Sequence, residues 1–265
     1  MRLMFMLIPP ADFTPNSAAP DDAAGSGSNS GETSAGEAVV AALANEPPLT
    51  PATAPRTLAG VVAFALSAVL SPYLVIPIGS LGIIYARSDS DKFWIWAAIS
   101  IFFSTALPVL YVLLGMARGT ISDVHVMERN QRGGPFAVAI LGGFFGAYVL
   151  HRMGAPVSVW GLSLLLSING LVIGIITTFT KISVHVSVLS STVLCAVILH
   201  PELNPHWLLW MIPALIWART KRGRHSVWQG VGGALVTIFV TSATIYALNL
   251  GPRLTQFVNN LLGAA

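Results

Sequence analysis

The sequence predicts an all-α membrane protein, a polytopic bundle of about six to seven transmembrane helices behind a disordered N-terminal tail. Of its 265 residues, 54% are hydrophobic and only 9% are charged, against about 25% charged residues in an ordinary soluble domain. Its mean hydropathy is +0.72. Six of the 11 acidic residues fall within the first 46 positions, so the rest of the chain is apolar and basic. This balance favours a membrane setting and anionic partners, and the chain lacks the basic, aromatic-rich stripe typical of nucleic-acid binding.

The chain divides into a tail and a membrane domain. Residues 1–56 are rich in Ala, Gly, Ser, Pro and acidic residues and show no hydrophobic periodicity, which predicts disorder. Their opening apolar patch is shorter than a signal-peptide core. Residues 57–250 form the predicted membrane domain, and residues 251–265 form a short C-terminal tail. The single cysteine, Cys195, lies in an apolar run and is interpreted as a packing residue.

Apolar stretches of about 20 residues, the length that crosses a bilayer, define the expected spans. The first stretch, residues 58–86, contains Ser71-Pro72 and Pro77, which predicts one tilted and kinked span rather than two half-helices. Tryptophans fall near the predicted ends, as in an aromatic belt. The other expected spans are residues 93–116, 135–152, 157–179, 183–199, 205–218 and 226–248.

Two short polar clusters interrupt this apolar pattern near the C-terminus. The first is Lys181-Ile-Ser183-Val-His185, and the second runs from Arg219 to His225. Because successive spans alternate in direction, both clusters and the loop at 117–134 are expected on one face of the membrane. Basic and imidazole groups are costly near hydrocarbon, so their convergence there predicts a functional site.

The residue types in these clusters suit a phosphate ester. A phosphate dianion needs several fixed cations and hydrogen-bond donors, and a helix N-terminus such as the one that Ser183 would cap supplies donors. His185 and His225 can divide the roles of proton donor and nucleophile, because imidazole titrates near neutral pH. This route needs no cofactor and no metal, and the sequence shows no convincing cluster of metal ligands. The candidate cations are Arg129, Arg132, Lys181, Arg219 and Arg224.

These residues resemble the type 2 phosphatidic acid phosphatase superfamily over residues 58–248. The spacing from Arg219 to His225 is similar to its third signature, which runs Arg, five residues, His, three residues, Asp. Ser183-Val-His185 is similar to its second signature, Ser-Gly-His, and the segment from Arg129 to Pro135 is a loose echo of the first. The combination most resembles a prokaryotic, integral-membrane branch, with Lys-Ile-Ser-x-His, Trp-Ala-Arg and an Arg-His near a Gln.

The resemblance implies a role for each matching residue. It implies that His225 is the nucleophile and that His185 is the general acid for the leaving group. The residues that it assigns to the phosphate oxygens are Lys181, Ser183, Arg219 and Arg132.

The sequence departs from the superfamily pattern at two of these positions. Gln229 stands where the third signature has Asp. Four residues after His225 on a helix, it can still accept the imidazole N–H, but it carries no charge to stabilise an imidazolium. Val184 replaces the Gly of the second signature, which limits the approach of the backbone to a ligand.

Together these features predict a metal-independent membrane phosphatase. Its expected partner is a phosphorylated lipid, either phosphatidate or an isoprenoid mono- or diphosphate, in the plasma membrane of a prokaryote, and a homo-oligomer is compatible with the sequence. Two alternatives stay open. One is a relative that binds anionic lipid but is catalytically weakened by Gln229. The other is a transporter or assembly protein, although no ionisable residue lies in the middle of a span and Asn169 is the nearest candidate.

Overall fold

A computed structural model describes residues 57–86, 90–122, 131, 133–200, 203 and 205–263. The predicted disorder of residues 1–56 therefore lies outside the described residues. Every regular element in the described part is helical, as the all-α prediction requires. Four helical stretches are long and apolar enough to cross a membrane: Asp91–Ala117, Gly133–Arg152, Val157–Phe179 and Val227–Ala247.

The structure supports a coarser count than six to seven spans. A fifth span is present only if the bent pair of helices α2 (Leu58–Val69) and α3 (Pro72–Tyr85) counts as one. Helix α8 (Val184–Leu199) is apolar but has only 16 residues. The 3₁₀-helix η4 (His206–Trp210) and helix α9 (Met211–Lys221) have five and 11 residues. The higher count stays a prediction, because these elements are shorter than the roughly 17–25 residues of a typical span.

The break between α2 and α3 follows from the sequence Ser71-Pro72. Proline restricts the preceding residue to extended backbone, and Ser71 has φ −74° and ψ 152°. Pro72 then begins α3, where its missing N–H costs nothing. The two helices meet at 55°. The predicted kink is therefore a break between two helices, whereas Pro77 stays inside α3.

The next span contains a π-helical turn. Helix α4 (Ser90–Ile101) continues through η1 (Phe102–Ala106) into α5 (Leu107–Ala117). Pro108 cannot donate a hydrogen bond to the turn before it, and such a defect is commonly absorbed by a π-bulge. Phe103 in this turn packs on helix α6 (Gly133–Arg152), where a Cβ on Gly146 would lie 2.9 Å from the Phe103 Cβ. Small residues thus let α6 approach the preceding span.

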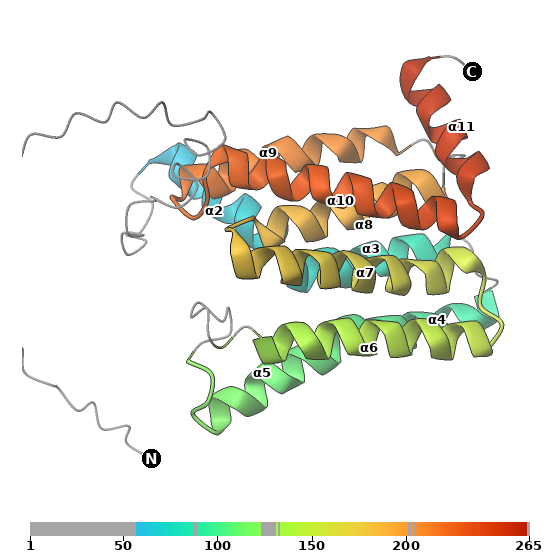
Figure 1. The fold of residues 1–265 in the computed structure, drawn as a ribbon, viewed down its shortest axis with the longest axis horizontal. Coiled ribbons are helices and arrows are strands. Elements are labelled where there is room, and N and C mark those ends of the chain that lie inside the picture. The colour runs from blue at the N-terminus through green and yellow to red at the C-terminus, as the bar shows by residue number, and fades with distance from the viewer. Residues whose placement is uncertain are drawn as a thin grey trace, which may run out of the picture.

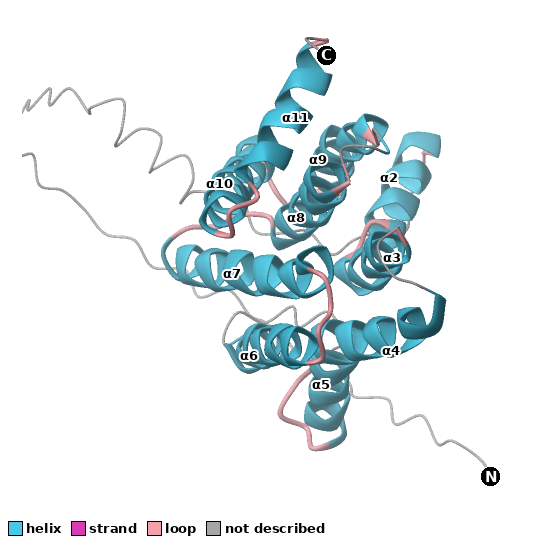
Figure 2. Cartoon of the chain, turned by 90° about the vertical axis from the view of Figure 1, so that its right-hand side faces the viewer, coloured by secondary structure: helices cyan, strands magenta, loops and turns pink. Residues whose placement is uncertain are grey.

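Helix α8 is the centre of the bundle. Figure 2 shows it surrounded by α3, α7 (Val157–Phe179), α9 and α10 (Val227–Ala247). Most of its residues are buried, including Val186, Leu189 and Ile198. Its packing explains how an apolar helix of only 16 residues is held inside the bundle.

Connections gather at two ends of the bundle. The α5–α6, α7–α8 and α9–α10 junctions lie at the same end, on the left in Figure 1. We call this the site end. At the opposite end the C-terminal segment adds helix α11 (Gly251–Leu262), in which Phe257 is buried and Arg253 donates to the Leu199 carbonyl. The alternation of helix direction thus brings the two polar clusters of the sequence to one end.

Candidate functional site

A direct backbone contact joins the two polar clusters. The Ser183 N–H donates to the Gln229 carbonyl over 3.2 Å, which links the first turns of α8 and α10. The helices can approach this closely because Gly233 has no side chain. A Cβ there would lie 2.7 Å from the Ser187 hydroxyl and 3.2 Å from the Ser183 carbonyl. Residues more than 40 positions apart in the sequence therefore share one junction.

A capping box holds the start of α10. The Ser226 hydroxyl accepts the Gln229 N–H over 3.3 Å, and Gln229 Oε1 in turn accepts the Ser226 N–H over 3.4 Å. The same oxygen lies 2.9 Å from His225 Nδ1. Gln229 is only 1% exposed. One buried side chain therefore caps the helix and positions the imidazole.

The capping box also determines which nitrogen of His225 carries the proton. The Ser226 N–H can only donate, so the atom that meets it must be the amide oxygen of Gln229 rather than its nitrogen. That oxygen can in turn only accept, so His225 Nδ1 must carry the hydrogen that it receives. In the neutral imidazole this places the lone pair on Nε2. This is the tautomer that a nucleophilic Nε2 requires.

Three buried donors at the site end have no hydrogen-bond partner among the described residues. They are the Ser183 hydroxyl, the Gln229 amide nitrogen Nε2 and the Arg219 guanidinium nitrogen Nε. Ser183 is 0% exposed, and its side chain makes no capping bond to α8. Buried polar groups are nearly always satisfied by protein, water or a ligand. A set of unsatisfied donors beside a cationic cluster is suited to an oxyanion.

The cationic cluster follows the last turn of α9. Arg219 is half-buried, and the Arg224 N–H donates to its carbonyl over 3.1 Å across a turn that contains Gly223, with φ +62°. Burial, with the charges of Arg222 and Arg224, lowers the pKa of Arg219 to about 10. This value still leaves the guanidinium protonated at neutral pH. The nearby Arg222 stacks 4.9 Å from the ring centroid of Phe64 on α2.

The remaining predicted site residues differ in burial and in their distance along the chain from the junction. His185 lies in the first turn of α8 and is half-buried, next to the junction. Lys181 lies between α7 and α8 and is exposed. Arg129 and Arg132 lie outside the described residues. The described end of α5 and start of α6, which flank these residues, lie at the site end, with α7 between this pair and α8 (Figure 1).

Sequence reasoning missed two residues of the junction. Ser226 escaped notice, although Ser226-x-x-Gln229 before an apolar run is the pattern of a capping box. Arg222 is not among the candidate cations, and its stacking on Phe64 is not predictable from the sequence because it depends on the packing of α2 against α9. The first residue had a local signal, whereas the second had none.

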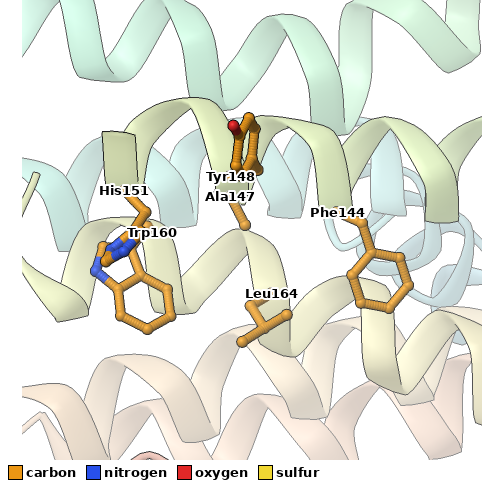
Figure 3. Close-up of a pocket in the computed structure, with 6 residues that line it drawn as sticks. All are labelled: Phe144, Ala147, Tyr148, His151, Trp160 and Leu164. Carbon is orange, nitrogen blue, oxygen red and sulfur yellow. The ribbon is translucent and has the colours of Figure 1, made fainter. Parts of the chain in front are cut away.

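The other histidines with described surroundings lie at the opposite end of the bundle. His200 is buried, and its Nε2 lies 3.1 Å from the Ile83 carbonyl near the end of α3, which is a structural role. His151 packs on Trp160 with ring centroids 5.2 Å apart. His151 and Trp160 line a hollow of about 240 Å³ between α6 and α7, which also involves Phe144, Tyr148 and Leu164 (Figure 3). Within the described residues no three His, Cys, Asp or Glu side chains lie together as metal ligands.

Comparisons with known proteins add no relationship. No protein-family model matches the chain, and no curated protein or solved structure matches it either.

Proposed function

We propose that the protein is a membrane phosphatase that hydrolyses a phosphorylated lipid, phosphatidate or an isoprenoid mono- or diphosphate, through a phosphohistidine at His225. The contact between His225 Nδ1 and Gln229 Oε1 is the observation that carries this proposal. It holds the imidazole in the tautomer with a nucleophilic Nε2. The unsatisfied donors of Ser183, Gln229 and Arg219 supply hydrogen bonds to the phosphate oxygens. Lys181 and Arg224 add charge at the same end.

The reaction proceeds in two steps, formation of the phosphohistidine and its hydrolysis. In the first, His225 Nε2 attacks phosphorus, the P–O ester bond breaks, and His185 gives a proton to the leaving oxygen. In the second, His185 takes a proton from water, the resulting hydroxide attacks phosphorus, and the P–N bond breaks. Inorganic phosphate leaves and the lone pair returns to Nε2. Gln229 keeps Nδ1–H oriented throughout, as the triad carboxylate does in serine hydrolases.

Substrate entry needs movement at the junction. The three unsatisfied donor atoms are shielded from solvent. His185, His225 and Arg219 are each half-buried and therefore form the accessible part of the site. A phosphate would first meet these side chains and then displace them slightly to reach Ser183 and Gln229.

Phosphate release from the purified protein tests this function. The full chain in detergent, with a chelator present, is offered phosphatidate, prenyl phosphate and prenyl diphosphate. His225→Ala should lower the rate by about 1,000-fold or more, because the nucleophile is lost. His151→Ala is the matched control, since His151 is exposed and lies at the opposite end. Equal phosphate release from His225→Ala and the unmodified protein would refute the phosphohistidine route.

A binder without turnover is the second candidate, and the uncharged side chain of Gln229 favours it. Retained binding of a lipid phosphate with no phosphate release would identify this case. Trapping a ³²P-labelled protein in His185→Ala, but not in His225→Ala, would instead support the two-step route.

A further inference from the structure

A second surface feature lies on the outer side of α9 and α10. It is a groove of about 550 Å³, which we call the α9–α10 groove. Its apolar lining includes Ile216 and Trp217 from α9 and Val227 and Val231 from α10. Both valines lie two residues from Gln229, which places them about 160–200° around the helix from it. The groove therefore opens on the side of α10 that faces away from the phosphate site.

A tight helix contact separates the groove from that site. A Cβ on Gly230 would lie 3.0 Å from two side-chain carbons of Ile216. The two helices thus touch between Gln229 on one side and Val231 on the other. A ligand in the groove therefore does not overlap the phosphate site.

The end of the groove is cationic. Lys221 lines it and is exposed, and Thr220 beside it has a buried hydroxyl with no partner within the described part of the chain. Arg222 follows directly in the sequence. Asp91 is the only acidic residue that the structure describes, and it begins α4 at the opposite end of the bundle (Figure 1). The charge at this end is therefore suited to an anion supplied from outside the described chain.

The position and length of the groove along α9 suit the boundary region of one bilayer leaflet. Trp228, next to Val227 at the cationic end, is 75% exposed, and Trp217, one helical turn before Lys221, is 44% exposed. Exposed tryptophans favour the interface between hydrocarbon and headgroups. Helix α10 is one of the four candidate spans, and an apolar groove on the outer side of a span is suited to contact with hydrocarbon. From Pro213 to Lys221 the groove follows α9 for eight residues, about 12 Å at 1.5 Å per residue. That length is close to one leaflet of a bilayer with a core of about 30 Å.

We infer that the α9–α10 groove binds an anionic phospholipid of the surrounding bilayer. One acyl chain lies along Ile216, Trp217 and Val231, and the phosphodiester pairs with Lys221 beside the Thr220 hydroxyl. An apolar groove with a cation at the headgroup level selects this chemistry over a zwitterionic lipid, whose own ammonium group would face Lys221. The inference does not depend on phosphatase activity.

Native mass spectrometry of the full chain tests the inference. The detergent-purified protein is incubated with dioleoylphosphatidylglycerol or dioleoylphosphatidylcholine, and the fraction that keeps one lipid is measured. Phosphatidylglycerol should be retained at least about fivefold more than phosphatidylcholine, which corresponds to about 1 kcal/mol. Val231→Trp fills the groove and should remove the retained lipid. Lys221→Gln should reduce the retention of phosphatidylglycerol to the level of phosphatidylcholine.

Matched controls separate the groove from other lipid contacts. Leu235→Trp places the same ring on an exposed position of α10 outside the groove lining, and Lys92→Gln removes an exposed cation at the opposite end. Both should retain phosphatidylglycerol like the unmodified protein, and so should His225→Ala. Equal retention of the two lipids would overturn the inference. So would loss of lipid in His225→Ala, because the lipid would then occupy the phosphate site.

Discussion

Gln229 uses its amide oxygen for two neighbours and has its amide nitrogen left for a third. The oxygen contacts Ser226 and His225, whereas the buried nitrogen has no partner among the residues that the structure describes. A carboxylate at this position would stabilise the protonated form of His225, but when ionised it could not donate a hydrogen bond to a phosphate. Compared with the Asp of the signature that the sequence resembles, Gln229 therefore lacks a charge but offers a hydrogen-bond donor, and such a donor suits the proposed phosphate binding at Ser183 and Arg219.

Replacing Gln229 tests this interpretation. Glu also fits a capping box, but position 229 is buried, so Gln229→Glu should keep the start of α10 and lower the free energy of unfolding by about 1–3 kcal/mol. It should weaken inhibition by inorganic phosphate, because a negative charge replaces the donor. It should also move the acidic limb of the kcat/KM profile to higher pH, because a carboxylate stabilises protonated His225, which cannot attack.

Gln229→Leu is the companion variant. It removes the contacts to His225 and Ser226 together, and phosphate release should fall by about 100-fold. Tighter inhibition by phosphate in Gln229→Glu than in the unmodified protein would contradict the proposed donor role.

Part of the site was predictable at the scale of single residues. The four-residue spacing of His225 and Gln229 indicated their contact, because positions four apart on a helix share a face, and the two side chains meet at 2.9 Å. The unsatisfied hydroxyl of Ser183 was not predictable, since serine at a helix start ordinarily caps that helix. Its side chain is instead buried, and the close approach of the Ser183 backbone to α10 depends on Gly233, which lies 46 residues after its other close neighbour, Ser187.

At the scale of elements, the first turns of α8 and α10 depend on close packing. Gly232 and Gly233 are neighbours that differ in what they contact. A Cβ on Gly232 would meet only Ile182 at 3.9 Å, an ordinary contact, whereas a Cβ on Gly233 would meet Ser187 at 2.7 Å. Replacing each glycine in turn by alanine therefore tests whether the close contact at Gly233 holds α8 and α10 together, with Gly232 as the control on the same helix.

Gly233→Ala should separate the two helices and break the bond from Ser183 to Gln229. The expected cost is about 1–3 kcal/mol of stability, with a loss of phosphate release. Gly232→Ala should leave the junction intact and raise helix propensity by up to about 1 kcal/mol. Thermal unfolding and phosphate release measure both effects. Equal behaviour of the two variants would show that the contact at Gly233 does not hold the site together.

Element boundaries were predictable in kind but not in detail. Residues 157–179 form the expected helix, which begins directly after Pro156 and ends before Thr180 and Lys181. The break at Ser71-Pro72 was indicated by proline, but its 55° angle arises from the packing of α2 on α9 and α3 on α8. Helix α11 falls in the segment expected as a tail. Its Leu254 and Phe257 pack against the core cluster three residues apart, which is a helical spacing.

At the scale of the whole molecule, alternation of direction places the site. Helices α7, α8, α9 and α10 run back and forth through the bundle (Figure 1). The shortness of α8 and α9 changes the number of candidate spans but not this alternation. The shared end of the two polar clusters was predictable for that reason, even though the count of spans was not.

Labelling from one side of the membrane tests this arrangement. Cysteines at Lys181 and Lys221 should react with an impermeant maleimide from the same side of a sealed vesicle, because both residues are exposed at the site end. A cysteine at Lys92 should react only from the other side. The native Cys195 is buried and should give little background. Labelling of Lys181→Cys and Lys92→Cys from one side would contradict the bundle.

The junction of α8 and α10 has a further electrostatic consequence. Each helix carries a partial charge of roughly +0.5 at its N-terminus, and the bond from Ser183 to Gln229 places these two positive ends side by side. Backbone dipoles do not titrate, unlike the imidazoles of His185 and His225. The attraction for an anion should therefore persist across a pH range in which turnover rises and falls, so that binding and chemistry respond to pH separately.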